Sequence, residues 1–302
     1  MLDLRRLRFL HELTARGTLA AVADALGYSA SAVSQQLAVL EREAGVALLE
    51  PAGRGVRLTD AGRVLAAHAG ILLERAAVAE AELAAAAGAP AGRGRIAAFQ
   101  SVAVRIALPA MGLLAARAPA LRTELVDGEP ETSLPALAAG DVDLVLGDEW
   151  QHQPRPRLEA LDRVDLLRDP VHVVVPARHP LAGSDRIALG ALAGEPFAAG
   201  PATAGYAQMV ERVCRELGGF EPDIRHRTND PTVLLEAVAQ GAAVTLLPAL
   251  VAPERHPGVA VRPAAEADLA RTVFAATRAV DRARPSVAAL VDAVREATAA
   301  LA

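Results

Sequence analysis

The sequence has little cysteine, no lysine and no long uninterrupted apolar segment. A single cysteine, Cys214, stands among 302 residues, which excludes an intramolecular disulfide and a multi-cysteine metal site. This argues against a disulfide-stapled secreted protein and favours a reducing compartment, the cytoplasm. All 31 basic residues are arginine, and against 36 acids they leave a net charge of −5. No global positive field therefore indicates nucleic-acid binding.

Export and membrane segments are not expected either. The arginines near the start are followed by His11 and Glu12 rather than by an apolar run, which predicts no signal peptide. The stretch 71–83 carries four charged residues, too many for the ~20 apolar residues of a membrane span. Because 52% of the residues are hydrophobic, we expect a globular chain with no membrane partner.

Charge and composition divide the chain into three parts, which we place at 1–59, 60–92 and 93–302. Residues 1–65 hold eight arginines against seven acids, whereas the remainder carries a net −6. Residues 60–87 are rich in alanine and free of proline, and a Gly- and Pro-containing segment follows at 88–92. This pattern is typical of a long helix and a linker.

From Arg95 onward, short apolar runs alternate with amphipathic stretches, which favours an α/β region with a parallel sheet. We expect strands at 96–99, 122–126, 142–146, 171–175, 197–199, 224–227 and 243–247. We expect helices at 104–117, 131–139, 206–217 and 231–239. The set of elements from residue 171 onward weakly repeats the order of strands and helices in the set before it.

The N-terminal part predicts a helix, a tight turn and a second helix. Thr18 can cap a helix over 19–26, which Gly27 ends, and Ser29 can cap a helix over 30–44. The apolar residues of the second helix repeat on one face at spacings of three and four. We expect that face, Val33, Leu37, Leu40 and Ala44, to be the core.

The opposite face of this second helix carries short polar side chains, among them Ser31, Ser34 and Gln35. A helix that enters the major groove needs small or hydrogen-bonding residues there. Strands at 46–49 and 56–58 would form a wing with Arg54 at its tip, where it can reach a phosphate or a minor groove. Spacing alone leaves open an ordinary helical bundle with a solvated hairpin.

The residues of this region resemble the winged helix-turn-helix of LysR-type transcriptional regulators. The likeness is dense over the first ~65 residues. It rests on Leu7-Arg8-Phe9, Gly17-Thr18-Leu19, Ala20 to Leu26, Ser29 to Gln36, Leu40-Glu41, Leu48-Leu49-Glu50 and Gly53 to Gly62. It implies DNA contacts by Ser29, Ala30, Ser31, Ser34, Gln35, Gln36 and Arg54, with double-stranded operator DNA as the partner.

The likeness continues at lower specificity through the rest of the chain. It implies a linker helix and an effector-binding region of two α/β subdomains similar to periplasmic solute-binding proteins. Subdomain I would comprise 93–165 and 266–302, and subdomain II 166–265. The chain departs from the family pattern at Ala30 and Ser31, where Gln and Pro are common, and at Gln35, where Arg is common. Operator preference therefore does not transfer.

The predicted long helix carries apolar residues at heptad spacing, which suits close pairing of two helices. The alternative is a helix packed on its own domain. The family resemblance implies the paired form, a homodimer, and leaves open whether dimers assemble into a homotetramer. The candidate dimer contacts are Leu65, Leu72, Ala79 and Leu83.

Several loops at predicted strand ends are candidates for a ligand site. Ser101, Thr203 and Thr228 offer hydroxyls near helix starts, an environment suited to a carboxylate or phosphate. The alternative for each is a cap or turn residue, and Arg105 is either a counter-charge or a solvated arginine. The resemblance places contacts to a small, anionic effector at Gln100, Ser101, Val102, Gly147, Gly200, Pro201, Thr203, Thr228 and Asn229.

Catalytic, metal and cofactor patterns are not found in the sequence. The seven histidines show no paired spacing with acids on a helix, and Cys214 lies on an apolar stripe typical of a buried thiol. No nucleophile elbow, phosphate loop or dinucleotide fingerprint is present. We therefore expect no enzyme, metal or cofactor, but a DNA-binding transcriptional regulator that responds to an effector. The alternative is a binding protein of the periplasmic type without regulatory DNA binding.

Overall fold

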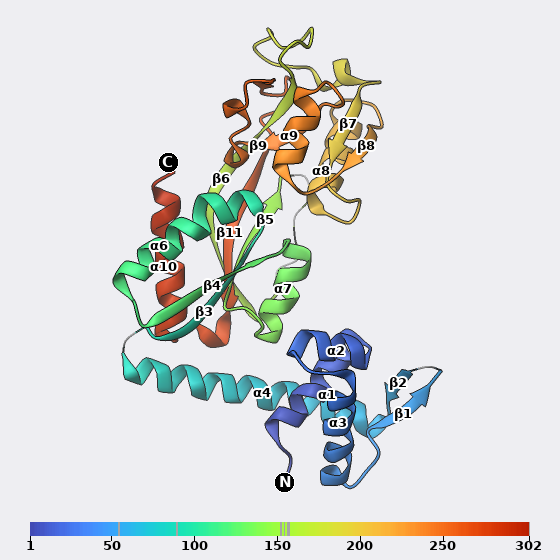
Figure 1. The fold of residues 1–302 in the computed structure, drawn as a ribbon, viewed down its shortest axis with the longest axis vertical. Coiled ribbons are helices and arrows are strands. Elements are labelled where there is room, and N and C mark those ends of the chain that lie inside the picture. The colour runs from blue at the N-terminus through green and yellow to red at the C-terminus, as the bar shows by residue number, and fades with distance from the viewer. Residues whose placement is uncertain (54, 89, 152, 154, 156–157, 302) are drawn as a thin grey trace. The chain divides into compact units, whose positions relative to one another are not determined.

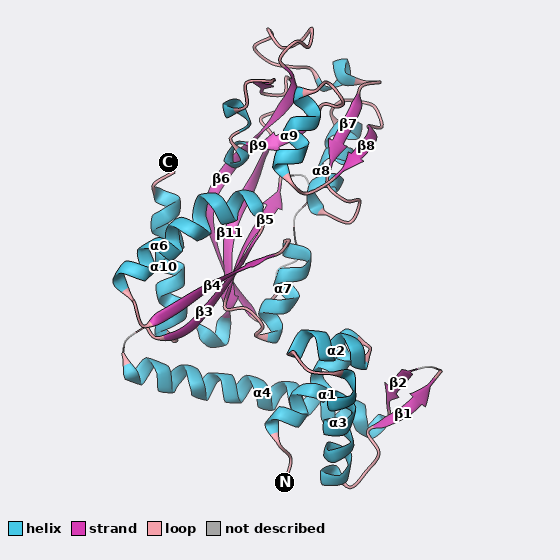
Figure 2. Ribbon diagram, viewed as in Figure 1, coloured by secondary structure: helices cyan, strands magenta, loops and turns pink. Residues whose placement is uncertain are grey.

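The computed structural model describes residues 1–53, 55–88, 90–151, 153, 155 and 158–301. Contacts divide the chain into two compact units, Met1–Ala87 and Gly88–Ala302. The predicted linker helix belongs to the first unit. Figure 1 traces both units by residue number, and Figure 2 shows their helices and strands. No helix within the described ranges is long and apolar enough to cross a membrane.

The first unit begins with three helices, of which the second and third have the predicted bounds. They are α1 (Leu4–Arg16), α2 (Leu19–Leu26) and α3 (Ala30–Ala44). The hydroxyls of Thr18 and Ser29 accept hydrogen bonds from the amides of Ala21 and Ala32, each at 3.2 Å, so both predicted caps are confirmed. The buried side chains of the three helices form one core, which includes Leu10, Val22, Val33, Leu37 and Leu40.

A two-stranded antiparallel wing follows, made of β1 (Leu49–Ala52) and β2 (Gly55–Leu58). The first strand begins later than the predicted 46–49. The carboxylate of Glu41 explains the shift, because it accepts the amides of Leu48 and Leu49 at 2.8 and 3.0 Å. These groups are thereby held to α3. The wing's Arg57 pairs with Glu50 at 2.8 Å across the two strands.

The long helix α4 (Asp60–Ala87) is capped by Thr59, whose hydroxyl accepts the Gly62 amide at 3.0 Å. Gly62 is required here because a Cβ would lie 2.1 Å from the Leu48 carbonyl oxygen. Leu65 packs against the core of the first unit. By contrast, Leu72 and Leu83 are 44% and 73% exposed.

The main sheet of the second unit contains both parallel and antiparallel strands, whereas the sequence predicts a parallel sheet. Its order is β10-β6-β11-β5-β3-β4, and β9 also pairs with β6. Strands β3, β4 and β5 are parallel, whereas β11 runs antiparallel to both β5 and β6. The bounds are β3 (Gly92–Ala98), β4 (Leu121–Asp127), β5 (Leu144–Trp150), β6 (Leu161–Pro176), β9 (Thr245–Pro248), β10 (Val259–Arg262) and β11 (Ala270–Arg278).

A separate parallel pair, β7 (Pro196–Ala199) and β8 (Asp223–Arg227), completes the strands that the structure describes. The helices are α5 (Gln100–Val102), a π-helical segment (Ala103–Ala107), α6 (Leu108–Arg117), α7 (Pro130–Ala139), α8 (Gly205–Glu216), α9 (Pro231–Ala239) and α10 (Pro285–Ala299). Short 3-10 turns lie at Leu189–Leu192, Ala249–Val251, Pro253–Arg255 and Ala279–Asp281.

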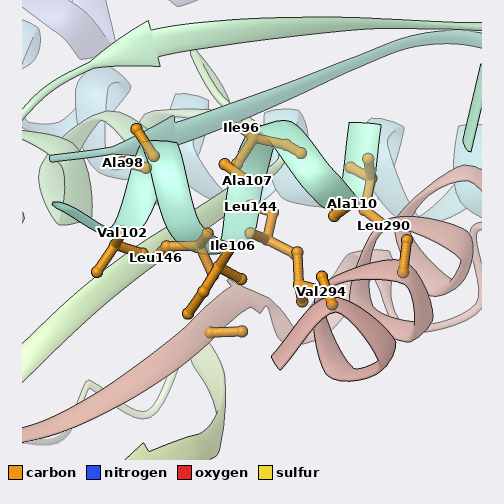
Figure 3. Close-up of a cluster of buried hydrophobic side chains, with 14 of the residues drawn as sticks. Ile96, Ala98, Val102, Ile106, Ala107, Ala110, Leu144, Leu146, Leu290 and Val294 are labelled. Carbon is orange, nitrogen blue, oxygen red and sulfur yellow. The ribbon is translucent and has the colours of Figure 1, made fainter. Parts of the chain in front are cut away.

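The second unit contains two principal hydrophobic cores. In the first, α6 and α10 cover one face of the sheet, where Ile106, Leu146, Leu290 and Val294 meet (Figure 3). Helix α7 covers the opposite face through Leu137. The second core joins β6, β7 and α8, and α9 packs on the other side of these strands. The long strand β6 contributes to both cores.

Candidate functional site

The exposed face of α3 is one candidate site. Ala30, Ser31, Ser34 and Gln35 are all exposed. Gln36 is half-buried instead, and its side-chain oxygen accepts a hydrogen bond from Arg6 Nε at 3.2 Å. The face therefore offers small residues and one long amide, a surface that can approach base edges closely.

Two predicted DNA contacts stand apart from the others. Ser29 is exposed but already serves as the cap of α3, and its hydroxyl also lies 2.9 Å from that of Ser31. Arg54 lies outside the described residues, so its predicted role at the wing tip stays a prediction. The neighbouring Arg57 is exposed on the wing.

The second candidate is a cavity in the second unit, with about 440 Å³ of empty space including its open mouth. Both principal cores of the unit contribute to its walls. The lining residues are Phe99, Gln100, Ser101, Glu129, Asp148, Trp150, Tyr206, Asn229, Pro231, Leu234, Leu247, Pro248, Val251 and Arg271.

Arg271, in the middle of the sheet on β11, organises the floor of this cavity and is only 4% exposed. Its Nε donates to Asp169 Oδ2 at 2.9 Å, and its Nη1 donates to Asp148 Oδ2 at 3.1 Å. Its Nη2 donates to Ser101 Oγ at 3.0 Å. The guanidinium also lies 5.1 and 5.4 Å from the ring centres of Phe99 and Trp150. Its charge is therefore compensated within the protein by two carboxylates.

Glu129 is the acid of the cavity wall that has no such compensation. Among the described residues it makes no side-chain hydrogen bond or ion pair. Burial, followed by the negative charges of Asp148 and Glu131, raises the pKa of Glu129 to about 7. Burial also raises the pKa of Asp148, against the opposing effect of Arg271 and Arg155.

A polar contact connects α7 with the start of α8. Arg155 Nη2 lies 2.8 Å from Glu131 Oε1 and 3.5 Å from Asp148 Oδ1. Glu131 Oε1 in turn accepts the Gly205 amide at 3.2 Å. The first amide of α8 therefore already binds a carboxylate of this chain.

Three of the predicted effector contacts, Gln100, Ser101 and Asn229, line the cavity. Val102 does not, because its side chain is fully buried in the first core (Figure 3). Gly147 lies inside β5 rather than in a loop, and a Cβ there would lie 2.5 Å from the Phe274 ring. Its role is close packing between β5 and β11.

The remaining predicted residues lie near the cavity in sequence but do not line it. Gly200 leaves room for Asn229, since a Cβ would lie 2.6 Å from Asn229 Oδ1. The Thr228 hydroxyl accepts the Asp230 amide at 3.0 Å, which is a turn contact. Pro201 and Thr203 are exposed.

The cation of the cavity is Arg271, whereas Arg105 lines a different hollow beside Arg295 and Leu301. Sequence reasoning passed over Arg271, Trp150 and Tyr206. A charged residue within the apolar run 270–276 was the available indication of Arg271. Nothing in the sequence around Tyr206 indicates that its hydroxyl lies 2.8 Å from Thr245 Oγ1.

Among the described residues, neither a reactive thiol nor a metal cluster accompanies these sites. Cys214 is buried, and burial raises the pKa of its thiol to about 12. Within the described part of the chain, no group of three or more His, Cys, Asp or Glu side chains is arranged to hold a metal ion.

Comparisons with known proteins cover 98% of the chain. The model for "Bacterial regulatory helix-turn-helix protein, lysR family" matches residues 4–63, and "LysR substrate binding domain" matches 87–299. The probable HTH-type transcriptional regulator LrrA of Synechococcus elongatus is 29% identical, across 98% of this chain and 97% of LrrA. A hydrogen peroxide-inducible genes activator of Dickeya chrysanthemi is 27% identical, across 98% and 95% of the two chains. A full-length OxyR variant from Pseudomonas aeruginosa has the same fold, with a TM-score of 0.67, 23% identity and coverage of 98% and 95%.

Proposed function

Because the chain belongs to the LysR family of transcriptional regulators, we propose that its α3 face reads the operator and that the cavity of its second unit binds the effector. The observation that carries the proposal is the cavity lining, which draws residues from both cores of the second unit. A ligand held there contacts both cores at once. It therefore has a means of favouring one arrangement of the two over another.

The proposed division of the chain follows from these roles. Residues 1–59 bind DNA, 60–92 form the dimerisation helix and hinge, and 93–302 bind the effector. Within the last part, the two cores support subdomains at 93–165 with 266–302 and at 166–265. Strand β6 (Leu161–Pro176) crosses the boundary between them.

Operator recognition is assigned to Ser31, Ser34 and Gln35, supported by Ala30 and by Arg54 of the wing. The exposed, small side chains near the start of α3 permit close approach to base edges. Gln36 supports α3 from the side through its hydrogen bond to Arg6. Chromosomal DNA as the target places the protein in the cytoplasm.

Self-association is assigned to the exposed stripe of α4. Leu72, Ala79 and Leu83 are exposed in the first unit, and pairing two copies removes their apolar surface from water. Leu65 is left out of this stripe because it packs against its own core.

We further propose that the protein is not an enzyme. Arg271 and Asp148 of the cavity are bound to each other, and Arg271 is also bound to the buried Asp169 behind the cavity wall. Glu129 faces the same cavity without a nucleophile or second acid-base group bonded to it in the described structure. The periplasmic-type alternative is disfavoured by the helix-turn-helix match over residues 4–63.

The proposal is tested with operator fragments selected from genomic DNA and bound at several salt concentrations. Gln35→Ala should change which bases the protein prefers. Arg54→Ala should weaken binding to every duplex, and it should reduce the slope of log affinity against log salt concentration by about one. Gln240→Ala, an exposed glutamine of the second unit, is the matched control. Unchanged sequence preference in the Gln35 variant would remove α3 from base readout.

A further inference from the structure

The charges that face the cavity are unequal, and this bears on the ligand. Three charged residues line the wall, namely Glu129, Asp148 and Arg271. Arg271 is bound by Asp148 and by the buried Asp169 behind it. An entering anion would have to compete with two carboxylates that the protein already holds on this arginine.

Two other positions that would suit an anion are already occupied by carboxylates of this chain. The first amide of α8, next to the wall residue Tyr206, is bound by the Glu131 carboxylate at 3.2 Å. At the start of α9, next to Pro231, the Asp230 carboxylate accepts the Thr232 amide at 2.8 Å. Carboxylates at helix N-termini satisfy the free amides and the dipole there.

Glu129 offers the opposite chemistry. It is half-buried and unpaired among the described side chains, and a buried carboxylate is costly without a partner. The rings of Trp150 and Tyr206, whose centres lie 5.9 Å apart, belong to the same wall. Aromatic rings attract cations, and the apolar side chains of Leu234, Leu247 and Val251 can take a hydrocarbon body.

We propose that the ligand of this cavity is a small organic cation, an ammonium group on an apolar body, with the ammonium paired to Glu129. The inference rests on the proposed function, because it names the effector class for the site assigned there. A cationic ligand is the opposite of the anionic effector that the hydroxyl-bearing loops predict from the sequence.

The test uses the full-length chain and probes that share a skeleton but differ in charge. The probes are 2-phenylethylamine, 3-phenylpropanoate and the neutral 2-phenylethanol, titrated by calorimetry at about pH 8. The amine should bind more tightly than the other two. Glu129→Gln, which keeps the shape, should weaken the amine about tenfold or more, as loss of a charged hydrogen bond does. Glu159→Gln, an exposed acid outside the cavity, should change nothing.

A pH series separates pairing with Glu129 from a merely structural effect of the variant. The groups that act on Glu129 are Asp148, Glu131 and Asp127, which raise its pKa, and Arg271, which lowers it. The pKa of Glu129 in the ligand-free protein is about 7, and a bound ammonium group stabilises the ionised carboxylate of Glu129. Amine affinity should therefore rise up to about tenfold between pH 6 and 8, with proton release. Glu129→Gln should lose this dependence.

Each outcome decides between the claims. Tighter binding of the carboxylate, no binding of the amine up to its solubility limit, or amine binding that Glu129→Gln leaves unchanged would overturn the inference. None of these results touches the assignment of the cavity as the effector site. If the amine binds through Glu129 but neither it nor the carboxylate alters operator binding, the ligand class stands and the effector role of the cavity fails.

Discussion

Arg271 and the two carboxylates around it depend on one another, because each is buried and charged. Arg271→Ala would leave Asp169 without its cation and Asp148 with Arg155 alone, at 3.5 Å. Removing one partner of a buried ion pair typically costs about 3–5 kcal/mol. Urea unfolding followed by the fluorescence of Trp150, the one tryptophan of the sequence, reports this loss directly.

Arg117→Ala is the control for that experiment. Its guanidinium pairs with Glu296 at 2.7 Å, but both side chains are exposed, and such pairs contribute little. The urea midpoint should hardly move. Equal midpoints for the two variants would mean that the buried cluster does not stabilise the unit.

The buried thiol of Cys214 should be unreactive in the folded protein. With its pKa at about 12, only about one thiol in ten thousand is ionised at pH 8. The native protein should resist alkylation by iodoacetamide and keep its operator binding in hydrogen peroxide, whereas the urea-unfolded chain should be alkylated. Rapid modification of the folded protein would show that the thiol is accessible.

Single residues also show how far the sequence could predict the site. Gln100, Ser101 and Asn229 were found because polar residues at strand ends and helix starts are local patterns. Arg271 was not, since its partners Ser101, Asp148 and Asp169 lie more than 100 positions away along the chain. Only the pairing of distant strands brings them together.

Among the elements, those with local end signals were predicted well. Helices α2 and α3 begin after the caps Thr18 and Ser29 and end at glycines with positive φ. Strand β5 was predicted to end at residue 146, but it continues to Trp150 because β11 pairs along its length. That extension moves Gly147 into the sheet and brings Asp148 and Trp150 to the cavity.

The exposed apolar stripe of α4, Leu72, Ala79 and Leu83, makes the proposed helix pairing testable. Leu72→Glu combined with Leu83→Glu places two charges on the exposed apolar stripe. An unpaired charge buried in a helix pair is costly. The variant should therefore sediment as a monomer at micromolar concentration, where we expect the native chain to be a dimer.

The control for this variant is Ala67→Glu, at an exposed position of α4 away from the stripe, which should stay dimeric. A native chain that sediments as a monomer, or a double variant that remains a dimer, would contradict pairing through α4.

For the whole molecule, the division into two units predicts two unfolding events. Trp150 reports on the second unit alone, whereas far-UV circular dichroism follows the helices of both. The two signals should give different thermal midpoints, and a fragment of residues 88–302 should fold by itself with the fluorescence transition of the full chain. Coincident transitions together with an unfolded fragment would show that the units depend on each other.

The place of β11 in the sheet has a consequence for synthesis of the chain. It lies between β5 and β6, yet it is the last strand of the described chain to leave the ribosome. Until then β5 and β6 each keep an unpaired edge, a state open to wrong association. The first unit is complete after residue 87. We therefore expect α4 of a nascent chain to be complete, and able to meet a partner helix, while β5 and β6 are still unpaired and the ligand cavity is unformed.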